Sequence, residues 1–113
     1  MNTHEKLNYV EFAARDLSAT KTFFSAVFGW EFVDYGPEYA AFSNQGLDGG
    51  FYKADVCSQT SNGAALLVFY SVDIQSTLQK VINNGGTIIK SLFDFPSGCR
   101  FHFAKPSGDE FAV

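Results

Sequence analysis

Charged side chains are scarce in this sequence of 113 residues, and the basic ones are the scarcer kind. Charged residues make up 18 % of the chain, against an average of about 25 % in globular proteins. Eight Lys and Arg against twelve Asp and Glu give a formal net charge of −4 at pH 7. No cluster of basic residues could follow a phosphate backbone, which argues against nucleic acid and anionic membrane as partners.

Cysteine and long apolar runs are also nearly absent. The two cysteines, Cys57 and Cys99, lie far apart and show no CxxC or Cys/His spacing. A zinc site or a disulfide scaffold is therefore not expected, and both residues are interpreted as free thiols. No apolar run approaches the roughly 20 residues of a membrane span, and Met1 to Lys6 is too short and polar for a signal peptide. We therefore predict a cytoplasmic protein.

Aromatic residues, by contrast, are abundant. Thirteen Phe, five Tyr and one Trp make up 17 % of the chain, and apolar residues reach 46 %, a content that excludes disorder. A domain of this length buries roughly two-thirds of its unfolded surface around one core, so we expect one domain over residues 1–113. The aromatic residues exceed what such a core needs, and some of them are expected to line a cavity.

An internal repeat appears when the two best helix signals are overlaid. Asp16-Leu17-Ser18-Ala19-Thr20 lies over Asp73-Ile74-Gln75-Ser76-Thr77, and Gly29 falls on Gly86 at the same offset. Each Asp is suited to cap a helix N-terminus, and each Gly to end that helix in a left-handed turn. The pattern predicts two helices of about 12 residues, each with one face on a sheet.

Alternating or turn-bounded apolar runs predict four strands in each half of the chain. The predicted strands are 7–14, 30–35, 39–43 and 47–53, then 65–72, 87–95, 99–104 and one that begins at Glu110. Each half therefore has the order βαβββ, with module one at about 7–54, a polar linker at about 55–63 and module two at about 64–113. The predicted fold class is α+β.

This order, together with several local motifs, resembles one known superfamily. The motifs are the strand-to-helix segment Val10-Glu11-Phe12-Ala13-Ala14-Arg15-Asp16-Leu17, then Phe23-Phe24, Phe28-Gly29-Trp30 and Phe101-His102-Phe103-Ala104-Lys105-Pro106-Ser107-Gly108-Asp109-Glu110. The family is the vicinal oxygen chelate superfamily of glyoxalase, bleomycin-resistance and extradiol dioxygenase proteins. The resemblance implies two tandem modules whose curved mixed sheets carry a helix on the outer face. The sequence leaves open whether residues follow Val113, where the last strand ends early for this family.

The resemblance also implies where a metal would be held. Enzymes of the superfamily bind one divalent ion with His, Gln or Glu on the first and last strands of each module. The matching positions here are Tyr9, Leu66 or Leu67, and Ala112, while the strand at 47–53 offers Asp48 only at its start. Leucine and alanine carry no donor atoms, so we predict no metal and no other cofactor. An unusual site built from Glu11, His102 and Glu110 is the alternative.

Strand alternation predicts which side chains face the concave side of the sheets. If Val10 and Phe12 pack under the helix, Tyr9 and Glu11 face the hollow, and the same alternation holds for the other strands. The predicted concave set is Tyr9, Glu11, Leu67, Phe69, Arg100, His102, Glu110 and Ala112. For some of these residues a purely structural role stays open: Glu11 paired with Arg100, His102 satisfied within its strand, and Glu110 solvated at a rim.

These features predict a small-molecule binding protein that sequesters a planar or cationic aromatic compound in an acidic, aromatic-lined groove without metal. The alternative is a lyase, isomerase or dioxygenase-like enzyme of the same fold that uses Glu11, His102 or Glu110, with or without an atypical metal. A third possibility is an interaction protein whose hollow is a dimer contact. Open sheet edges and exposed aromatic surface predict a homodimer. The sequence does not name the ligand, nor whether one chain or two form the groove.

Overall fold

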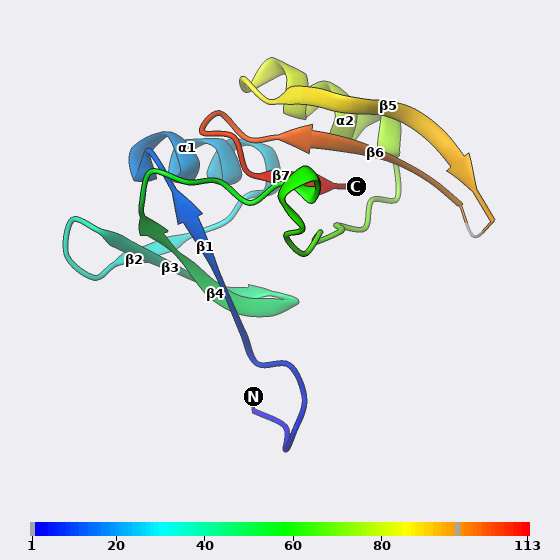
Figure 1. Ribbon diagram of the computed structural model, residues 1–113. Helices are drawn as coiled ribbons and strands as arrows, with labels where there is room; N and C mark the ends of the chain where they lie inside the picture. Colours follow the sequence, from blue (N-terminus) through cyan, green and yellow to red (C-terminus); the bar gives the residue numbers. More distant parts are fainter. Residues whose placement is uncertain (1, 97) are drawn as a thin grey trace.

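The computed structural model describes residues 2–96 and 98–113. Figure 1 shows two sheets with two helices beside them, and the chain passes from the lower sheet to the upper one through a linker that includes a 3-10 turn. The elements are β1 (Tyr9–Ala14), α1 (Leu17–Phe28), β2 (Phe32–Asp34), β3 (Tyr39–Gln45), β4 (Leu47–Lys53), η1 (Thr60–Asn62), α2 (Ile74–Asn83), β5 (Thr87–Phe95), β6 (Gly98–Ala104) and β7 (Glu110–Ala112). The predicted α+β class and the two-sheet architecture are confirmed.

The first sheet has the strand order β1-β4-β3-β2. β1 runs parallel to β4, with Glu11 opposite Gly50, and the other two pairings are antiparallel. Residues that lie directly opposite one another in a sheet point to the same side. This register therefore fixes which side chains of β1, β3 and β4 share a face.

The second sheet repeats this order but loses most of its first strand. β5, β6 and β7 pair antiparallel, and the predicted strand at 65–72 is reduced to one parallel bridge between Val68 and Ala112. Ala112 donates to the Leu67 carbonyl at 3.1 Å and accepts from the Phe69 amide at 2.8 Å. The predicted eight-residue strand is wrong, because β7 is only three residues long and its Glu110 amide is already bonded to the Ser58 carbonyl.

Both helices begin as predicted from their aspartates. Asp16 accepts from the Ala19 amide at 3.0 Å, and Asp73 accepts from the Ser76 amide at 3.2 Å. α1 ends at Gly29, which has the expected left-handed φ of 72°. At the end of α2 the left-handed residue is Gly85, with φ 90°, and not Gly86. Gly86 is needed for another reason, since a Cβ there would overlap the Val81 side chain.

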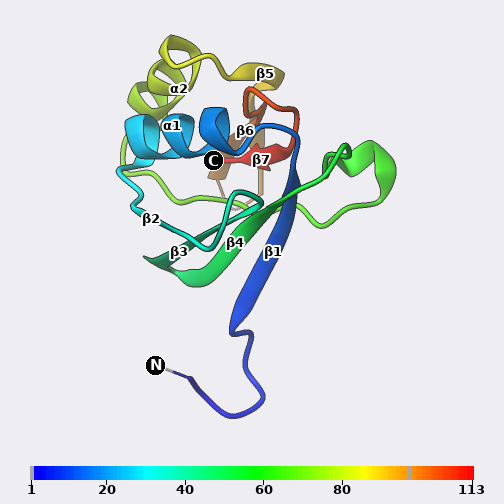
Figure 2. The ribbon, with the colours of Figure 1, turned by 90° about the vertical axis from the view of Figure 1, so that its left-hand side faces the viewer.

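Helix α1 packs against both sheets and so forms the centre of the core (Figure 2). The Phe24 ring lies 5.5 Å from that of Phe51 in the first sheet and 5.3 Å from that of Phe111 in the second. The opposite face of the first sheet is open to solvent, with the Tyr9 side of β1 exposed. Within residues 2–96 and 98–113, no helix is long and apolar enough to cross a membrane.

Candidate ligand-binding site

The open face of the first sheet carries the first two predicted site residues, Tyr9 and Glu11. Both are exposed, whereas Phe12, on the opposite face of β1, is buried, as the alternation of β1 predicts. The register places Asp48 of β4 opposite Tyr9. It places Tyr39 of β3 opposite Tyr52 of β4, which points to the same side of the sheet as Asp48. The open face therefore gathers phenol rings and carboxylates from three strands.

Three of these side chains form a directed chain of hydrogen bonds. The Tyr39 hydroxyl donates to Glu11 Oε2 at 2.9 Å, and the hydroxyl oxygens of Tyr9 and Tyr39 lie 2.5 Å apart. A carboxylate only accepts, so Tyr39 gives its proton to Glu11 and accepts the proton of Tyr9. The Tyr9 oxygen keeps free lone pairs but has no proton left to offer. A ligand group that meets it must be a donor.

The environment of Tyr39 holds this arrangement in place. Burial, the hydrogen bonds with Tyr9 and Glu11, and the negative charge of Glu11 raise the pKa of Tyr39 far above its ordinary value. The phenol therefore stays a neutral donor to Glu11. Gly50 provides the room, because a Cβ at this position would overlap the Tyr39 hydroxyl.

Beside this chain lies an acidic hollow of about 570 Å³ on the same sheet. Its walls include the side chains of Tyr9, Glu31, Val33, Tyr35 and Asp48, and no Lys or Arg is among the lining residues. Asp48 accepts from the Asn44 amide at 3.1 Å through one oxygen, which leaves its second oxygen for a ligand. The hollow thus offers aromatic surface and hydrogen-bond acceptors in a negative environment.

The predicted site residues of β6 and β7 are placed differently. His102 Nδ1 lies 2.7 Å from Glu110 Oε2, and the two side chains are only 6 % and 4 % exposed. Glu110 Oε1 accepts from both the amide and the hydroxyl of Thr60, each at 2.9 Å. Thus Glu110 is not a solvated rim residue. Since the linker covers it, neither it nor His102 lines the hollow.

Arg100 and Glu11 each interact with a different partner. The Arg100 guanidinium lies 4.7 Å from the centre of the Phe95 ring. The Glu11 carboxylate instead accepts from Tyr39. The two side chains are therefore engaged separately, and the open possibility that they pair across the sheet finds no support.

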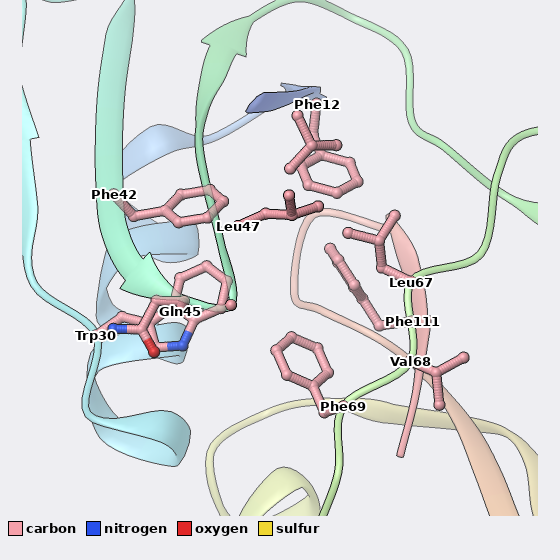
Figure 3. A pocket seen from close by; sticks show the side chains of 11 residues that line it. Phe12, Trp30, Phe42, Gln45, Leu47, Leu67, Val68, Phe69 and Phe111 are labelled. Atoms are coloured by element: carbon pink, nitrogen blue, oxygen red, sulfur yellow. The ribbon is translucent and has the colours of Figure 1, made fainter. Parts of the chain in front are cut away.

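Leu67 and Phe69 lie on the core side of their segment, which corrects their predicted position beside Tyr9 and Glu11. Phe69 stacks on Phe28 with ring centres 4.4 Å apart. Both residues line an apolar cavity of about 250 Å³ between the two sheets, together with Phe12 (Figure 3). The error has a physical cause: residues 64–70 are apolar without a break, so alternation cannot fix which of them face the helix.

The positions that hold a metal in the enzymes of this fold do not suit one here. Tyr9, Leu66 or Leu67, and Ala112 offer at most one phenol oxygen, and that oxygen is hydrogen-bonded to Tyr39. Glu110, the nearest carboxylate on β7, has both oxygens engaged. Within the described ranges 2–96 and 98–113, no group of three or more His, Cys, Asp or Glu side chains is placed to share an ion. Divalent metals need converging donors, and this donor set does not fit one.

Sequence reasoning missed three residues of this face: Tyr35, Tyr39 and Asp48. Alternation along 39–45 already places Tyr39, Ala41 and Ser43 on one side. The missing information was the strand order, since only the β4 strand between β1 and β3 brings Tyr39 to Glu11. Applying the expected βαβββ pairing to the first module would have found Tyr39.

Two consecutive modules define a class of paired-module proteins: β1 and β4 pair in parallel in the first module, and the parallel bridge between Val68 and Ala112 corresponds to this pairing in the second. The family model of the Glyoxalase/Bleomycin resistance protein/Dioxygenase superfamily matches residues 6–113, and the chain belongs to this superfamily. The resemblance inferred from the sequence is therefore confirmed. No curated protein matches the sequence.

Solved structures agree on the fold. A glyoxalase/bleomycin resistance protein/dioxygenase family enzyme from Burkholderia phytofirmans PsJN is 18 % identical, with 96 % of each chain covered and a TM-score of 0.78. The fosfomycin resistance protein FosX from Mesorhizobium loti is 15 % identical over 97 % of this chain and 91 % of its own, with a TM-score of 0.75. Lactoylglutathione lyase from Agrobacterium tumefaciens is 18 % identical over 98 % and 93 %, with a TM-score of 0.72. At these identities the likeness concerns the fold alone.

Proposed function

We propose that the protein sequesters a planar aromatic cation with N–H donors on the open face of the first sheet, without a metal. The observation that carries this proposal is the chain from Tyr9 through Tyr39 to Glu11 beside a hollow whose lining contains no basic residue. Together these groups present acceptors and negative charge to whatever binds there.

The chemistry of the hollow selects for such a ligand in two ways. The faces of Tyr rings attract cations, and partly desolvated carboxylates interact with a cation more strongly than solvated ones do, because screening is weaker there. The Tyr9 oxygen and the second Asp48 oxygen both require donors. A protonated amine or amidine meets both needs, whereas an anion meets neither.

A second copy of the chain would complete this site as a homodimer, the assembly predicted from the sequence. One chain leaves the open face uncovered: Val33 is 59 % and Tyr35 is 67 % exposed. Apolar surface of this kind favours association. A partner lying over the face would bury these side chains and enclose the ligand between the two copies.

The enzyme alternative has less support from the geometry. Lactoylglutathione lyase shares the fold, but His102 and Glu110 are buried, and both Glu110 oxygens have partners. Neither residue lines the acidic hollow. Of the three residues in that alternative, only Glu11 lies on an exposed face, and it is engaged by Tyr39.

Calorimetric titration with 9-aminoacridine, a planar cation with N–H donors, tests the proposal. The wild-type chain should bind it, and Glu11→Gln or Asp48→Asn should weaken binding about ten- to a hundredfold, the roughly 1.5–3 kcal/mol of a charge-assisted contact. The matched control is Asp94→Asn, an acid-to-amide change on the exposed side of β5, and it should leave the affinity unchanged. Unchanged affinity in both Glu11→Gln and Asp48→Asn would refute the proposal.

A further inference from the structure

A second cavity lies on the other side of the first sheet, between the two modules. Its volume is about 250 Å³, and it is bounded by core-facing side chains of β1, β3 and β4 together with the segment that replaces the first strand of module two. In Figure 3, Trp30 and Phe42 lie on one side of it, and Leu67 and Phe111 lie on the other. This cavity and the acidic hollow lie on opposite faces of the sheet, and Phe42 borders both.

Aromatic rings form a large part of the cavity wall, since five of its eleven lining residues are aromatic. The rings of Trp30 and Phe42 lie 4.3 Å apart, and those of Phe12 and Phe111 lie 5.2 Å apart. Each pair is therefore already in contact, and the space between the two pairs remains open (Figure 3). The cavity is concave, only partly enclosed and lined mainly by apolar side chains, as small-molecule sites usually are.

The lining restricts what that occupant can be. It contains no ionisable side chain, and its polar groups are the Gln45 amide and the Trp30 indole N–H. A charged ligand would lose its hydration there without gaining a partner. The Gln45 nitrogen donates to the Ser43 carbonyl at 3.3 Å, which leaves the amide oxygen as an acceptor for one ligand donor.

The cavity is only partly enclosed, and residues 67–69, together with Phe111, form the wall that the second module contributes. Within the part of the chain that the structure describes, the backbone of residues 67–69 pairs with the second sheet at one bridge, between Val68 and Ala112. They therefore lack the ladder of backbone hydrogen bonds of a full strand, and side-chain packing such as that of Phe69 on Phe28 holds them in place. Leu67 and Phe69, on either side of the bridge, line the cavity.

We propose that this cavity binds a neutral aromatic molecule of one or two fused rings, with at most one hydrogen-bond donor. An engineered cavity of roughly 150 Å³ with similar Leu, Ile and Phe walls binds benzene, and the larger volume here accommodates a second ring. The site is distinct from the acidic hollow in position and in chemistry, because one selects neutral ligands and the other selects cations.

Calorimetric titration of the full chain with 2-naphthol tests this inference, with naphthalene-2-sulfonate as the charged compound of the same ring system. We expect 2-naphthol to bind at one site per chain and at least tenfold more tightly than the sulfonate. Leu67→Trp fills the cavity and should weaken 2-naphthol binding at least tenfold. The matched control is Val72→Trp, which adds the same side chain at a position that is 92 % exposed, and it should bind as the wild type does.

Leu47→Phe fills the cavity from the opposite side and decides the matter if circular dichroism shows that Leu67→Trp does not fold. Weakened 2-naphthol binding in a folded filling variant supports the site. The inference is overturned if the wild type shows no saturable heat with 2-naphthol, if the sulfonate binds equally well, or if a folded filling variant keeps the wild-type affinity.

Discussion

The His102 imidazole and the Glu110 carboxylate form a buried pair, with Nδ1 and Oε2 2.7 Å apart on adjacent strands. The same carboxylate accepts from Thr60, which lies 50 residues earlier in the chain. The Glu110 side chain thus connects the linker between the modules to the last strand by hydrogen bonds. Burial alone would raise the pKa of Glu110, but the hydrogen bonds from His102 and Thr60 outweigh it and lower the pKa below its ordinary value.

Glu110→Gln should therefore destabilise the protein in a pH-dependent way. At neutral pH the expected loss is roughly 1.5–3 kcal/mol of unfolding free energy, typical of a buried hydrogen bond to a charged group. The folded state binds the Glu110 proton more weakly than the unfolded chain, where the pKa is about 4.3. The stabilisation is thus complete above that pKa and is lost as the pH falls through the lower folded-state value.

Urea unfolding of both proteins across this acid range measures the effect. The difference in unfolding free energy between wild type and Glu110→Gln should narrow as the pH falls. The control Glu38→Gln, which changes an exposed acid, should unfold with the wild-type free energy. A free-energy difference that stays constant with pH would show that the ionised carboxylate is not what stabilises the linker.

Lys105 and Asp109 form a second buried pair, with both side chains fully inaccessible and Nζ 3.3 Å from Oδ2. Burial lowers the pKa of Lys105 and raises the pKa of Asp109, while the attraction between the two charges opposes both shifts. The Lys105 ammonium also donates to Thr20 of α1 at 3.1 Å, and Asp109 accepts from the Ser58 amide at 2.8 Å. The pair therefore joins α1, the linker and the β6–β7 turn.

Lys105→Met should destabilise the protein by about 3–5 kcal/mol, because it leaves the Asp109 charge buried without a partner. Adding Asp109→Asn removes that charge, so the double variant should lose much less than the sum of the two single losses. Chemical denaturation of the four proteins gives the coupling directly. Additive losses would mean that the two charges do not stabilise each other.

Gly50→Ala should weaken the binding of 9-aminoacridine, since the added methyl group displaces the Tyr39 hydroxyl from Glu11. Tyr39→Phe removes the same hydroxyl without crowding the sheet and should have a similar effect, about five- to tenfold in affinity for one lost hydrogen bond. Tyr70→Phe, at a position 89 % exposed on the other module, is the matched control. Wild-type affinity in Tyr39→Phe would show that the hydrogen-bond chain does not orient the ligand site.

Light scattering at high micromolar concentration tests the homodimer. The wild type should have the mass of two chains. Val33→Lys places a charge on the open face and should shift the protein toward the monomer, since an unpaired charge in an apolar contact is costly. A wild type that stays monomeric would mean that one chain alone forms the binding site.

The features that follow from local chemistry could be predicted from the sequence. Asp16 and Asp73 cap their helices because a short carboxylate at the start of an amphipathic run accepts the free backbone N–H groups of the first turn. The two faces of β1 are clear because Tyr9 and Glu11 alternate with Val10 and Phe12. These two sets of residues gave the βαβββ order and half of the open face.

The features that depend on distant contacts could not be predicted. Glu110 is buried only because Thr60 covers it from the linker. The Lys105 ammonium has Asp109 of its own turn as a partner, but it also donates to Thr20 of α1, which is distant in the sequence. Leu67 and Phe69 belong to an apolar run with no alternation, so only their packing against α1 reveals their face.

Intermolecular nuclear Overhauser effects between 9-aminoacridine and the protein test the central claim most directly, because they locate the ligand. The aromatic protons of the ligand should show contacts to the rings of Tyr9 and Tyr35 on the open face of the first sheet. Contacts to Phe69 and Phe111 in the apolar cavity, or to neither set of rings, would contradict the assignment of the acidic face as the cation-binding site.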